Sequence, residues 1–298
     1  MIVVKLKGGM GNQMFQYACG RAQAERYQTE LKLDLSFLLS RIQRPELTLR
    51  NYELDLYNIT ASIANPTDIR NLTVFVDESC LGLKRKVQKL VQQFYILFGS
   101  KHVLEKGSKF DISLIQKMKK NCYLDGYWQS EKYFENIEPI IRQEFTFNTP
   151  LPEPAISLAT QIEKVEAVAI FVRRTDFLGK SVHIMLDENQ ILKGVDYIKK
   201  HIKSPCLYIF SDEIEWCQKN LHFDLPTFFV TEEYKGARFT DHFRLMSLCK
   251  YFIIPISSFA WWAAWLCTYS DKIILHAQNP LYPDWAAKGW LEINDNLR

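Results

Sequence analysis

Two adjacent arginines, Arg173 and Arg174, follow directly on an apolar run that ends at Val172. A guanidinium stays charged at physiological pH and can bind phosphate through two parallel hydrogen bonds. Two such cations at the end of a buried strand are costly unless an anion meets them. We therefore predict a bound phosphate here, with Arg173 as its main ligand. Arg174 either binds the same anion or is architectural, held by Asp176 or by carbonyl groups at a helix end.

Hydroxyl and carboxylate groups occupy two further strand-to-helix junctions. Ser257 and Ser258 precede a predicted helix, and backbone N–H groups at a helix N-terminus bind phosphate without a metal. Asp241 opens another predicted helix, where it either caps the helix or accepts hydrogen bonds from the edge of a guanine. Asp212 lies in a similar position after a strand, and we interpret it as a helix cap.

A glycine-rich segment near the start, KGGMGNQMFQYA, contains Gly8, Gly9 and Gly11. Glycines allow a sharp turn between strand and helix and leave room for a ligand. The N–H groups of the following helix suit an anion or a sugar hydroxyl. As a dinucleotide fingerprint the segment is incomplete, because Met14 stands in place of the third glycine. The segment is either a tight structural turn or a ligand-binding loop.

The elements that must position these residues are predicted from the apolar pattern. The chain opens with an expected strand at 2–6, a turn at 7–12, a helix at 13–26 and a strand at 31–35. Later strands are expected at 165–172, 206–210, 227–230, 251–256 and 272–276, with helices at 194–202, 213–221, 240–249 and 259–267. Apolar strands alternating with helices predict parallel sheets, in which ligands gather at the carboxyl ends of the strands.

Length and composition bound the class of protein. The chain has 298 residues, 47% of them hydrophobic, which is enough for two domains. The proline-rich segment FNTPLPEPAI is the predicted linker, so we expect domains at 1–150 and 151–298. A net charge of +3 gives no general case for nucleic acid. Seven cysteines and six histidines without paired spacing predict neither a disulfide framework nor a metal site.

One amphipathic segment bears on whether the protein contacts a membrane. The sequence has no run of the roughly 20 apolar residues that a spanning helix needs, and we expect a cytoplasmic protein. Apolar residues recur at helical spacing, beside four basic residues, at Leu83, Val87, Leu90, Val91, Phe94 and Phe98. The predicted helix either packs on its own domain with a solvated charged face or docks peripherally on an anionic membrane, such as the inner face of the plasma membrane.

Five ordered blocks of sequence carry a family resemblance. They are GGMGNQMFQYA, DGYWQSEKYF, VRRTDF, FSDE, and TDHFRLMSLC followed by SSFAWWAAWL. Together they resemble the bacterial α-1,2-fucosyltransferases of glycosyltransferase family 11, over nearly the whole chain. The resemblance implies an α/β, GT-B-like fold with two Rossmann-like domains, mainly parallel sheets and an inter-domain cleft. The N-terminal domain would lie on the acceptor side, and the C-terminal domain would bind GDP-L-fucose.

The activity implied by this resemblance is an inverting transfer of L-fucose to the 2-hydroxyl of a terminal β-galactoside, in surface polysaccharide (O-antigen) or oligosaccharide synthesis. It needs neither a metal nor a cofactor, because GDP-L-fucose is a co-substrate. Arg173 would bind the β-phosphate of the departing GDP, with Ser257 and Ser258 beside it, and Asp241 would recognise guanine.

Further site residues follow from the same resemblance. Additional donor contacts are expected from Gly9, Gly11, Asn12, Arg174 and Phe171. Acceptor contacts are expected from Gln13 and, because of its place in the loop after the arginines, from His183, for which the alternative is an ordinary surface histidine. Asp176 is the predicted catalytic carboxylate, and Asp125 is a second candidate for the base, although a loose transition state needs little help from a base. The sequence does not fix the oligomeric state.

Four positions depart from the family pattern. Phe171 replaces a histidine, Thr175 a glycine, Ile256 an asparagine and Ala263 a glycine. Phe171 can stack on the nucleotide or simply pack. We expect these changes to affect efficiency, donor choice or acceptor choice rather than the fold. A member with a different acceptor or linkage, and a nucleotide-sugar-binding homologue with weakened catalysis, are the alternative hypotheses.

Overall fold

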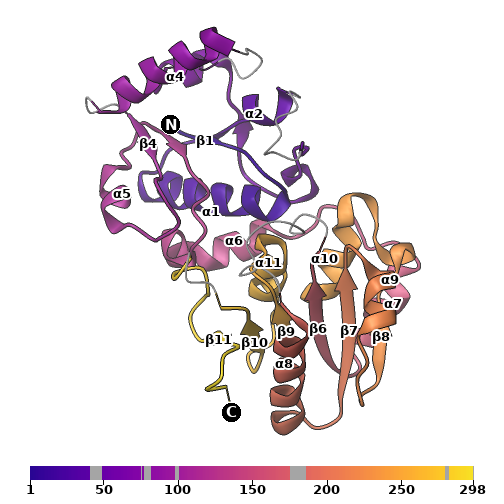
Figure 1. Cartoon of the computed structure of the whole chain (residues 1–298). Helices are drawn as coiled ribbons and strands as arrows, with labels where there is room; N and C mark the ends of the chain where they lie inside the picture. Colours follow the sequence, from indigo (N-terminus) through magenta and orange to yellow (C-terminus); the bar gives the residue numbers. More distant parts are fainter. Residues whose placement is uncertain are drawn as a thin grey trace. The chain divides into compact units, whose positions relative to one another are not determined.

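The computed structural model describes residues 1–40, 49–74, 76, 82–97, 101–174, 186–278 and 282–297. Contacts divide the chain into two units, Met1–Thr149 and Pro150–Arg298. Each unit is built on one sheet whose named strands all pair in parallel (Figure 1). The predicted α/β class with mainly parallel sheets is confirmed. The roles of the two units as acceptor side and donor side stay predictions.

Unit 1 contains a sheet in the order β3-β2-β1-β5-β4. Its strands are β1 Ile2–Lys5, β2 Leu31–Asp34, β3 Ser62–Ile63, β4 His102–Leu104 and β5 Cys122–Asp125. Its helices are α1 Met10–Arg26, α2 Ser36–Leu39, α3 Pro66–Arg70, α4 Gly82–Leu97, α5 Ile112–Lys117 and α6 Glu138–Glu144, with short 3-10 turns η1 Leu54–Leu56, η2 Glu131–Tyr133 and η3 Glu135–Ile137. The central strand β1 is almost wholly apolar, and α1 packs against it. This burial explains why both elements form.

Unit 2 contains a sheet in the order β11-β10-β9-β6-β7-β8. Its strands are β6 Glu166–Val172, β7 Pro205–Ser211, β8 Thr227–Phe229, β9 Tyr251–Ile254, β10 Ile273–His276 and β11 Leu291–Glu292. Its helices are α7 Ala155–Ile162, α8 Glu188–His201, α9 Ile214–Asn220, α10 Thr240–Ser247 and α11 Ser258–Leu266, with 3-10 turns η5 Glu232–Tyr234 and η6 Ala237–Phe239. Because every pairing is parallel, the carboxyl ends of β9, β6 and β7 lie at one edge of the sheet.

Helix α11 is apolar on nearly every side because it is buried in the core of unit 2. Trp261 and Trp262 are fully buried, and the Trp261 indole N–H donates a 2.6 Å hydrogen bond to the Trp285 carbonyl. The Trp265 ring stacks on that of Trp261 at 6.0 Å. A rigid aromatic core therefore fixes the direction of this helix.

Helix α1 begins at Met10, earlier than the predicted start at Gln13. Gly9 has extended backbone angles and serves as the N-cap, so the helix starts directly after it. Gly11 and Asn12 therefore lie in the first turn and not in a loop. Gly8 has a φ of +80°, and a Cβ there would collide with the Asn12 side chain, so the turn requires glycine at that position.

In the parts of the chain that the structure describes, no helix is long and apolar enough to cross a membrane.

The packing of α1 on β1 depends on Gly20. A methyl group at this position would collide with the Val4 side chain and lie 2.9 Å from Leu31 Cδ1. We expect Gly20→Ala to lower the free energy of unfolding by about 1–3 kcal/mol in denaturant titrations. Gly9→Ala is the control, because its methyl would lie at an ordinary 3.7 Å from the Arg50 Nε. Equal stability of Gly20→Ala and the unaltered protein would contradict this account of the interface.

Candidate active site

Arg173 lies where the central strand of unit 2 ends. It follows Val172, the last residue of β6, and is half-buried. The register pairs Ile170 of β6 with Ile253 of β9, so Arg173 and Ser257 leave neighbouring strands at the same edge. Adjacent strands are about 4.8 Å apart. The predicted anion ligands of two separate motifs are thus brought to one edge of the sheet.

Phe259 connects the elements that carry these ligands. This residue is in the first turn of α11, and its ring centroid is 5.6 Å from that of Phe171 on β6. The same ring lies 5.2 Å from Phe243 on α10, in an edge-on arrangement. Phe171 is only 6% exposed, so it occupies the packing role among its two predicted alternatives. Its contact with the donor stays a prediction.

The start of α11 presents hydrogen-bond donors that the described residues do not use. Ser257 is the N-cap in extended conformation, without a side-chain capping bond. Neither its hydroxyl nor that of Ser258 hydrogen-bonds to another described residue. The first turn contains no acidic side chain. The positive end of the helix dipole therefore lies beside Arg173 and favours an anion.

Arg174 is held by its own unit. Its guanidinium Nε donates a 2.8 Å hydrogen bond to Glu213 Oε2, and its Cζ lies 3.7 Å from the centroid of the Trp216 ring. Ion pairing and stacking together fix a planar guanidinium. The architectural alternative for Arg174 is thus what the structure shows, with Glu213 as the partner. Its predicted donor contact stays a prediction.

The interpretation of Asp212 as a helix cap is wrong. Helix α9 begins at Ile214 with Glu213 as its N-cap and has no side-chain capping bond. Instead, Asp212 Oδ1 accepts a 2.9 Å hydrogen bond from the backbone N–H of Arg174. The carboxylate ties the segments after β6 and β7 together, because the Arg174 N–H needs an acceptor once the strand ladder has stopped.

Asp241 lies in the first turn of α10 and is almost buried. The N-cap is Phe239, so the capping alternative for Asp241 is wrong. Gly236 has a φ of +66°, and a Cβ there would collide with the Asp241 carboxylate. Arg238 and Phe239 also have positive φ angles, of 58° and 61°. Strained backbone of this kind persists only where the surroundings impose it, and it gathers at functional sites.

Aromatic contacts place the start of α10 against the end of β7. The Phe210 ring, near the end of β7, meets the His242 ring edge-on at 5.9 Å. His242 Nε2 lies 3.1 Å from the Thr231 carbonyl oxygen, and burial lowers the pKa of this histidine. Asp241 is therefore positioned near the carboxyl end of β7. Arg173, Ser257 and Asp241 thus lie near the carboxyl ends of β6, β9 and β7, three neighbouring strands.

A cluster of charges lies at the carboxyl edge of the sheet in unit 1. Lys7 Nζ is 2.9 Å from Asp125 Oδ1, and Lys5 Nζ is 3.7 Å from Oδ2. Burial by itself would raise the pKa of Asp125, but the two ammonium groups outweigh it and hold this pKa well below its usual range. A carboxylate with so low a pKa accepts protons poorly near neutral pH. Asp125 is thus a poor candidate for the base.

Glu105, which no sequence motif indicates, holds a loop of unit 1. Its Oε2 accepts hydrogen bonds from the backbone N–H groups of Tyr127, at 2.6 Å, and Trp128, at 2.9 Å. Burial raises the pKa of Glu105, against these hydrogen bonds. Trp128 is fully buried with a φ of +56°, and Gly126 has no room for a Cβ beside Glu105. Glu105 therefore shapes the loop that contains the DGYWQ block.

The buried Gln13 side chain holds the glycine turn by hydrogen bonds. Its Nε2 donates to the carbonyls of Gly8, at 2.9 Å, and Asn51, at 2.7 Å, while its Oε1 accepts from the N–H of Glu53 at 3.0 Å. The side chain is fully buried. Gln13 thus has a structural role, and its contact with an acceptor stays a prediction. On the preceding residue, Asn12 Oδ1 accepts a 2.6 Å hydrogen bond from Gln129 Nε2.

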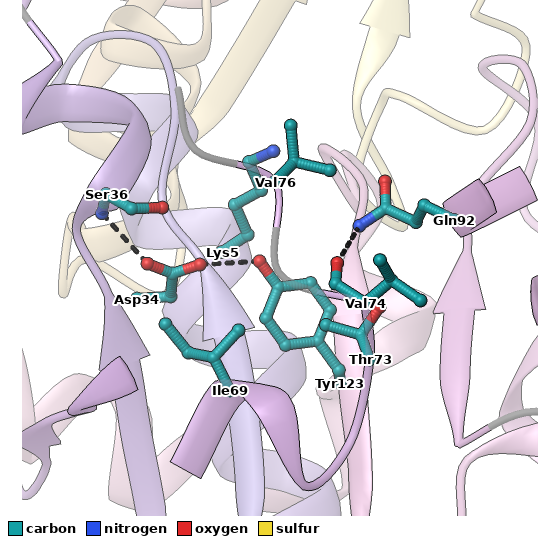
Figure 2. Close-up of a pocket in the computed structure, with 9 residues that line it drawn as sticks. All are labelled: Lys5, Asp34, Ser36, Ile69, Thr73, Val74, Val76, Gln92 and Tyr123. Atoms are coloured by element: carbon teal, nitrogen blue, oxygen red, sulfur yellow. Dashed lines mark hydrogen bonds between the residues drawn. The ribbon is translucent and has the colours of Figure 1, made fainter. Parts of the chain in front are cut away.

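Figure 2 shows a small pocket in unit 1 that none of the predicted site residues lines. Its lining residues are Lys5, Asp34, Ser36, Ile69, Thr73, Val74, Val76, Gln92 and Tyr123. Asp34 accepts hydrogen bonds from the Tyr123 hydroxyl at 2.5 Å and from the Ser36 N–H at 2.8 Å. These internal bonds already occupy the carboxylate, so the pocket is a structural feature of this unit.

Two predicted site residues, Asp176 and His183, lie outside the described residues. Among the residues described, no group of three or more His, Cys, Asp or Glu side chains could hold a metal ion. Independence from metals stays a prediction.

The sequence model of Glycosyl transferase family 11 matches residues 1–288. The chain belongs to this family. Among curated relatives, the α-1,2-colitosyltransferase of Escherichia coli is 29% identical over 283 residues, 92% of this chain and 90% of that protein. The E. coli O-antigen biosynthesis glycosyltransferase WbnK is 26% identical over 295 residues, 91% of each. Human galactoside α-(1,2)-fucosyltransferase 1 is 28% identical over 156 residues, 48% of this chain and 42% of that protein.

The fold of this family 11 member is also similar to that of a solved structure. The fucosyltransferase NodZ from Bradyrhizobium superposes with a TM-score of 0.52 at 12% identity, over 88% of this chain and 91% of NodZ. At this identity the likeness concerns the fold alone. It confirms the predicted GT-B-like class.

The electrostatics around Asp125 predict a pH dependence of stability through His102. This ring is buried, its Nε2 is 4.0 Å from Asp125 Oδ2, and burial lowers its pKa to about 4. The folded protein therefore keeps His102 neutral, while the unfolded chain takes up a proton near pH 6.5. The contribution of neutral His102 to the free energy of unfolding is fully present above pH 6.5. It falls by on the order of 3 kcal/mol as the pH drops from 6.5 towards 4.

Urea titrations across this pH range measure the effect. The His102→Gln variant of this family 11 protein should lose that part of the pH slope, because glutamine does not titrate. An identical slope in the variant and the unaltered protein would contradict a neutral, buried His102.

Proposed function

We propose that this chain is a galactoside α-1,2-fucosyltransferase. It transfers L-fucose from GDP-L-fucose to the 2-hydroxyl of a terminal β-galactoside, in the synthesis of an O-antigen or a related oligosaccharide. The observation that carries the proposal is the convergence of Arg173 and the start of α11 at one edge of the sheet in unit 2. Membership of family 11 and the activities named for its relatives support it. NodZ, a protein of similar fold, has been crystallised with GDP and soaked with GDP-fucose.

The proposed binding site for GDP-L-fucose follows from the chemistry of these groups. The diphosphate of GDP lies between the Arg173 guanidinium, the Ser258 backbone N–H and the hydroxyl groups of Ser257 and Ser258; the Ser257 N–H already donates to the Pro255 carbonyl at 2.8 Å. Asp241, near the end of the next strand but one, accepts two hydrogen bonds from the guanine edge. Its carboxylate is largely shielded from water, which strengthens such bonds.

The reaction breaks the bond between fucose C1 and the β-phosphate oxygen. The bonding electrons leave with GDP, so negative charge builds on the β-phosphate while the sugar gains oxocarbenium character. A fixed guanidinium and a helix N-terminus stabilise this charge more strongly in the transition state than in the ground state. The acceptor hydroxyl attacks the opposite face of C1, which inverts the configuration, and loses its proton to a base, for which Asp176 is our candidate. We propose neither a metal nor a cofactor.

Donor choice has a second candidate, a colitosyl donor. The E. coli α-1,2-colitosyltransferase aligns with 92% of this chain. Colitose is fucose without its 3-hydroxyl group. A site that hydrogen-bonds a hydroxyl rejects the analogue that lacks it, whereas an apolar site discriminates less. Phe171 and Ile256 place apolar, buried side chains where the family has polar ones, and this favours tolerance of the deoxy sugar.

Replacement of Arg173 tests the proposed binding site for the diphosphate of the donor. We expect Arg173→Ala to reduce the rate of fucosyl transfer on the order of 10²-fold or more, because it removes a preorganised cation from the leaving group. Arg174→Ala is the matched control, since that guanidinium is engaged by Glu213 and Trp216. It should lower the melting temperature but keep transfer within about tenfold of the unaltered enzyme. Full activity of Arg173→Ala, or an equal loss in both variants, would remove the assigned role.

A panel of donors and acceptors tests the reaction itself. The protein is incubated with GDP-fucose or the colitosyl analogue and with several β-galactosides, and the linkage in each product is determined by NMR. We expect a fucosyl group on the 2-hydroxyl of galactose. Transfer from the colitosyl donor alone favours the second candidate, and another linkage indicates a different acceptor. Binding of GDP without any transfer would point to a homologue with weakened catalysis and would refute both candidates.

A further inference from the structure

Helix α4 turns its polar side toward unit 1. The half-buried residues of this helix are Arg85, Gln88, Gln92 and Ile96, which recur at spacings of three and four and so share one face. Gln92 Nε2 donates a 2.8 Å hydrogen bond to the Val74 carbonyl, which anchors this face (Figure 2). The attachment of α4 to its own unit is therefore mainly polar.

The apolar side of α4 faces solvent. Leu83, Leu90 and Phe94 are 77%, 64% and 63% exposed, and Val87 and Val91 are exposed as well. At about 100° per residue these five side chains form one stripe on the side opposite Gln92. Figure 1 shows α4 at the outer edge of unit 1. The usual arrangement of an amphipathic surface helix, with its apolar face on the core, is thus reversed.

Positive charge borders this apolar stripe. The 16 residues of Gly82–Leu97 include four basic and no acidic side chains. Exposed Lys84 and Lys86 lie on opposite flanks of the stripe, each about 80° from the midline of the stripe. Long lysine stems can lie along an apolar surface while their ammonium groups reach outward. Apolar side chains flanked by cations are the pattern of a helix that lies in a membrane interface.

We propose that α4 docks this protein on the surface of an anionic lipid bilayer. The helix lies parallel to the membrane, with its apolar stripe at the boundary of the acyl chains and its lysines on the phosphate headgroups. At about 24 Å it is too short and too basic to span the bilayer. Charge argues for lipid over a second copy of the chain, because a twofold pairing of α4 would bring its cations together. The proposal concerns a surface and is independent of the sugar that is transferred.

Co-sedimentation with vesicles tests this proposal on the full chain. Vesicles of phosphatidylcholine containing about a third phosphatidylglycerol are compared with vesicles of phosphatidylcholine alone. We expect binding to the anionic vesicles that weakens at high salt. The double variant Leu83→Ser/Leu90→Ser should lower the partition coefficient by about tenfold or more, because it removes apolar area from the interface. Lys84→Glu/Lys86→Glu should lower it by about tenfold at low salt.

Matched controls change the same residue types elsewhere. Ile112→Ser removes an exposed apolar side chain of unit 1, and Lys199→Glu/Lys200→Glu reverses two exposed charges of α8. Both should bind as the unaltered protein does. Melting temperatures of the α4 variants should be unchanged, because the altered side chains are exposed. Failure of the unaltered protein to bind anionic vesicles, or full binding by Leu83→Ser/Leu90→Ser, would overturn the proposal. A concentration-dependent dimer that this variant abolishes would overturn it too and would identify a second copy as the partner.

Discussion

The packing of Phe259 against Phe171 and Phe243 determines where three sets of polar groups lie in unit 2. One ring joins the end of β6, the first turn of α11 and the body of α10. Because Phe259 directly follows Ser258 in the chain, its packing holds the N-terminus of α11 beside Arg173. An apolar contact thus fixes the geometry of the candidate site, and it does so without using any of the groups that a ligand would need.

Two neighbouring arginines have different environments because they follow one extended strand. Arg174 is engaged by Glu213 and stacks on Trp216, both from the segment after β7. Arg173 directly follows β6, at the same edge of the sheet as the segment that leads from β9 to α11. The Asp212 carboxylate helps to keep the two side chains apart, because it accepts a hydrogen bond from the Arg174 N–H and so holds the main chain between the two arginines. A pair of like charges is in this way separated into a structural cation and a candidate ligand.

The apolar runs of the sequence predicted much of the fold. Strand β6 was expected at 165–172 and is found at Glu166–Val172, because a continuous run of buried residues leaves little freedom in placing a central strand. The start of α1 was predicted too late, since an extended Gly9 caps the helix without a side chain that sequence could reveal. The short strands β3 and β11 were not predicted, because two residues carry no periodic signal.

The site was less predictable than the fold, since its contacts join distant parts of the chain. Nothing local to Arg174 indicates Glu213 or Trp216, and nothing local to Glu105 indicates the backbone of Tyr127. For α4 the periodicity predicted a helix correctly, but a pattern alone does not say which face the rest of the unit covers. Tertiary contacts decide that question, and here they select the polar face.

The most direct measurement of the central claim is a crystal structure of the protein with bound GDP. The account predicts that β-phosphate oxygens lie about 2.7–2.9 Å from the Arg173 guanidinium, with the diphosphate also facing the N–H groups at the start of α11. A diphosphate bound away from Arg173, with the start of α11 facing only solvent, would contradict it.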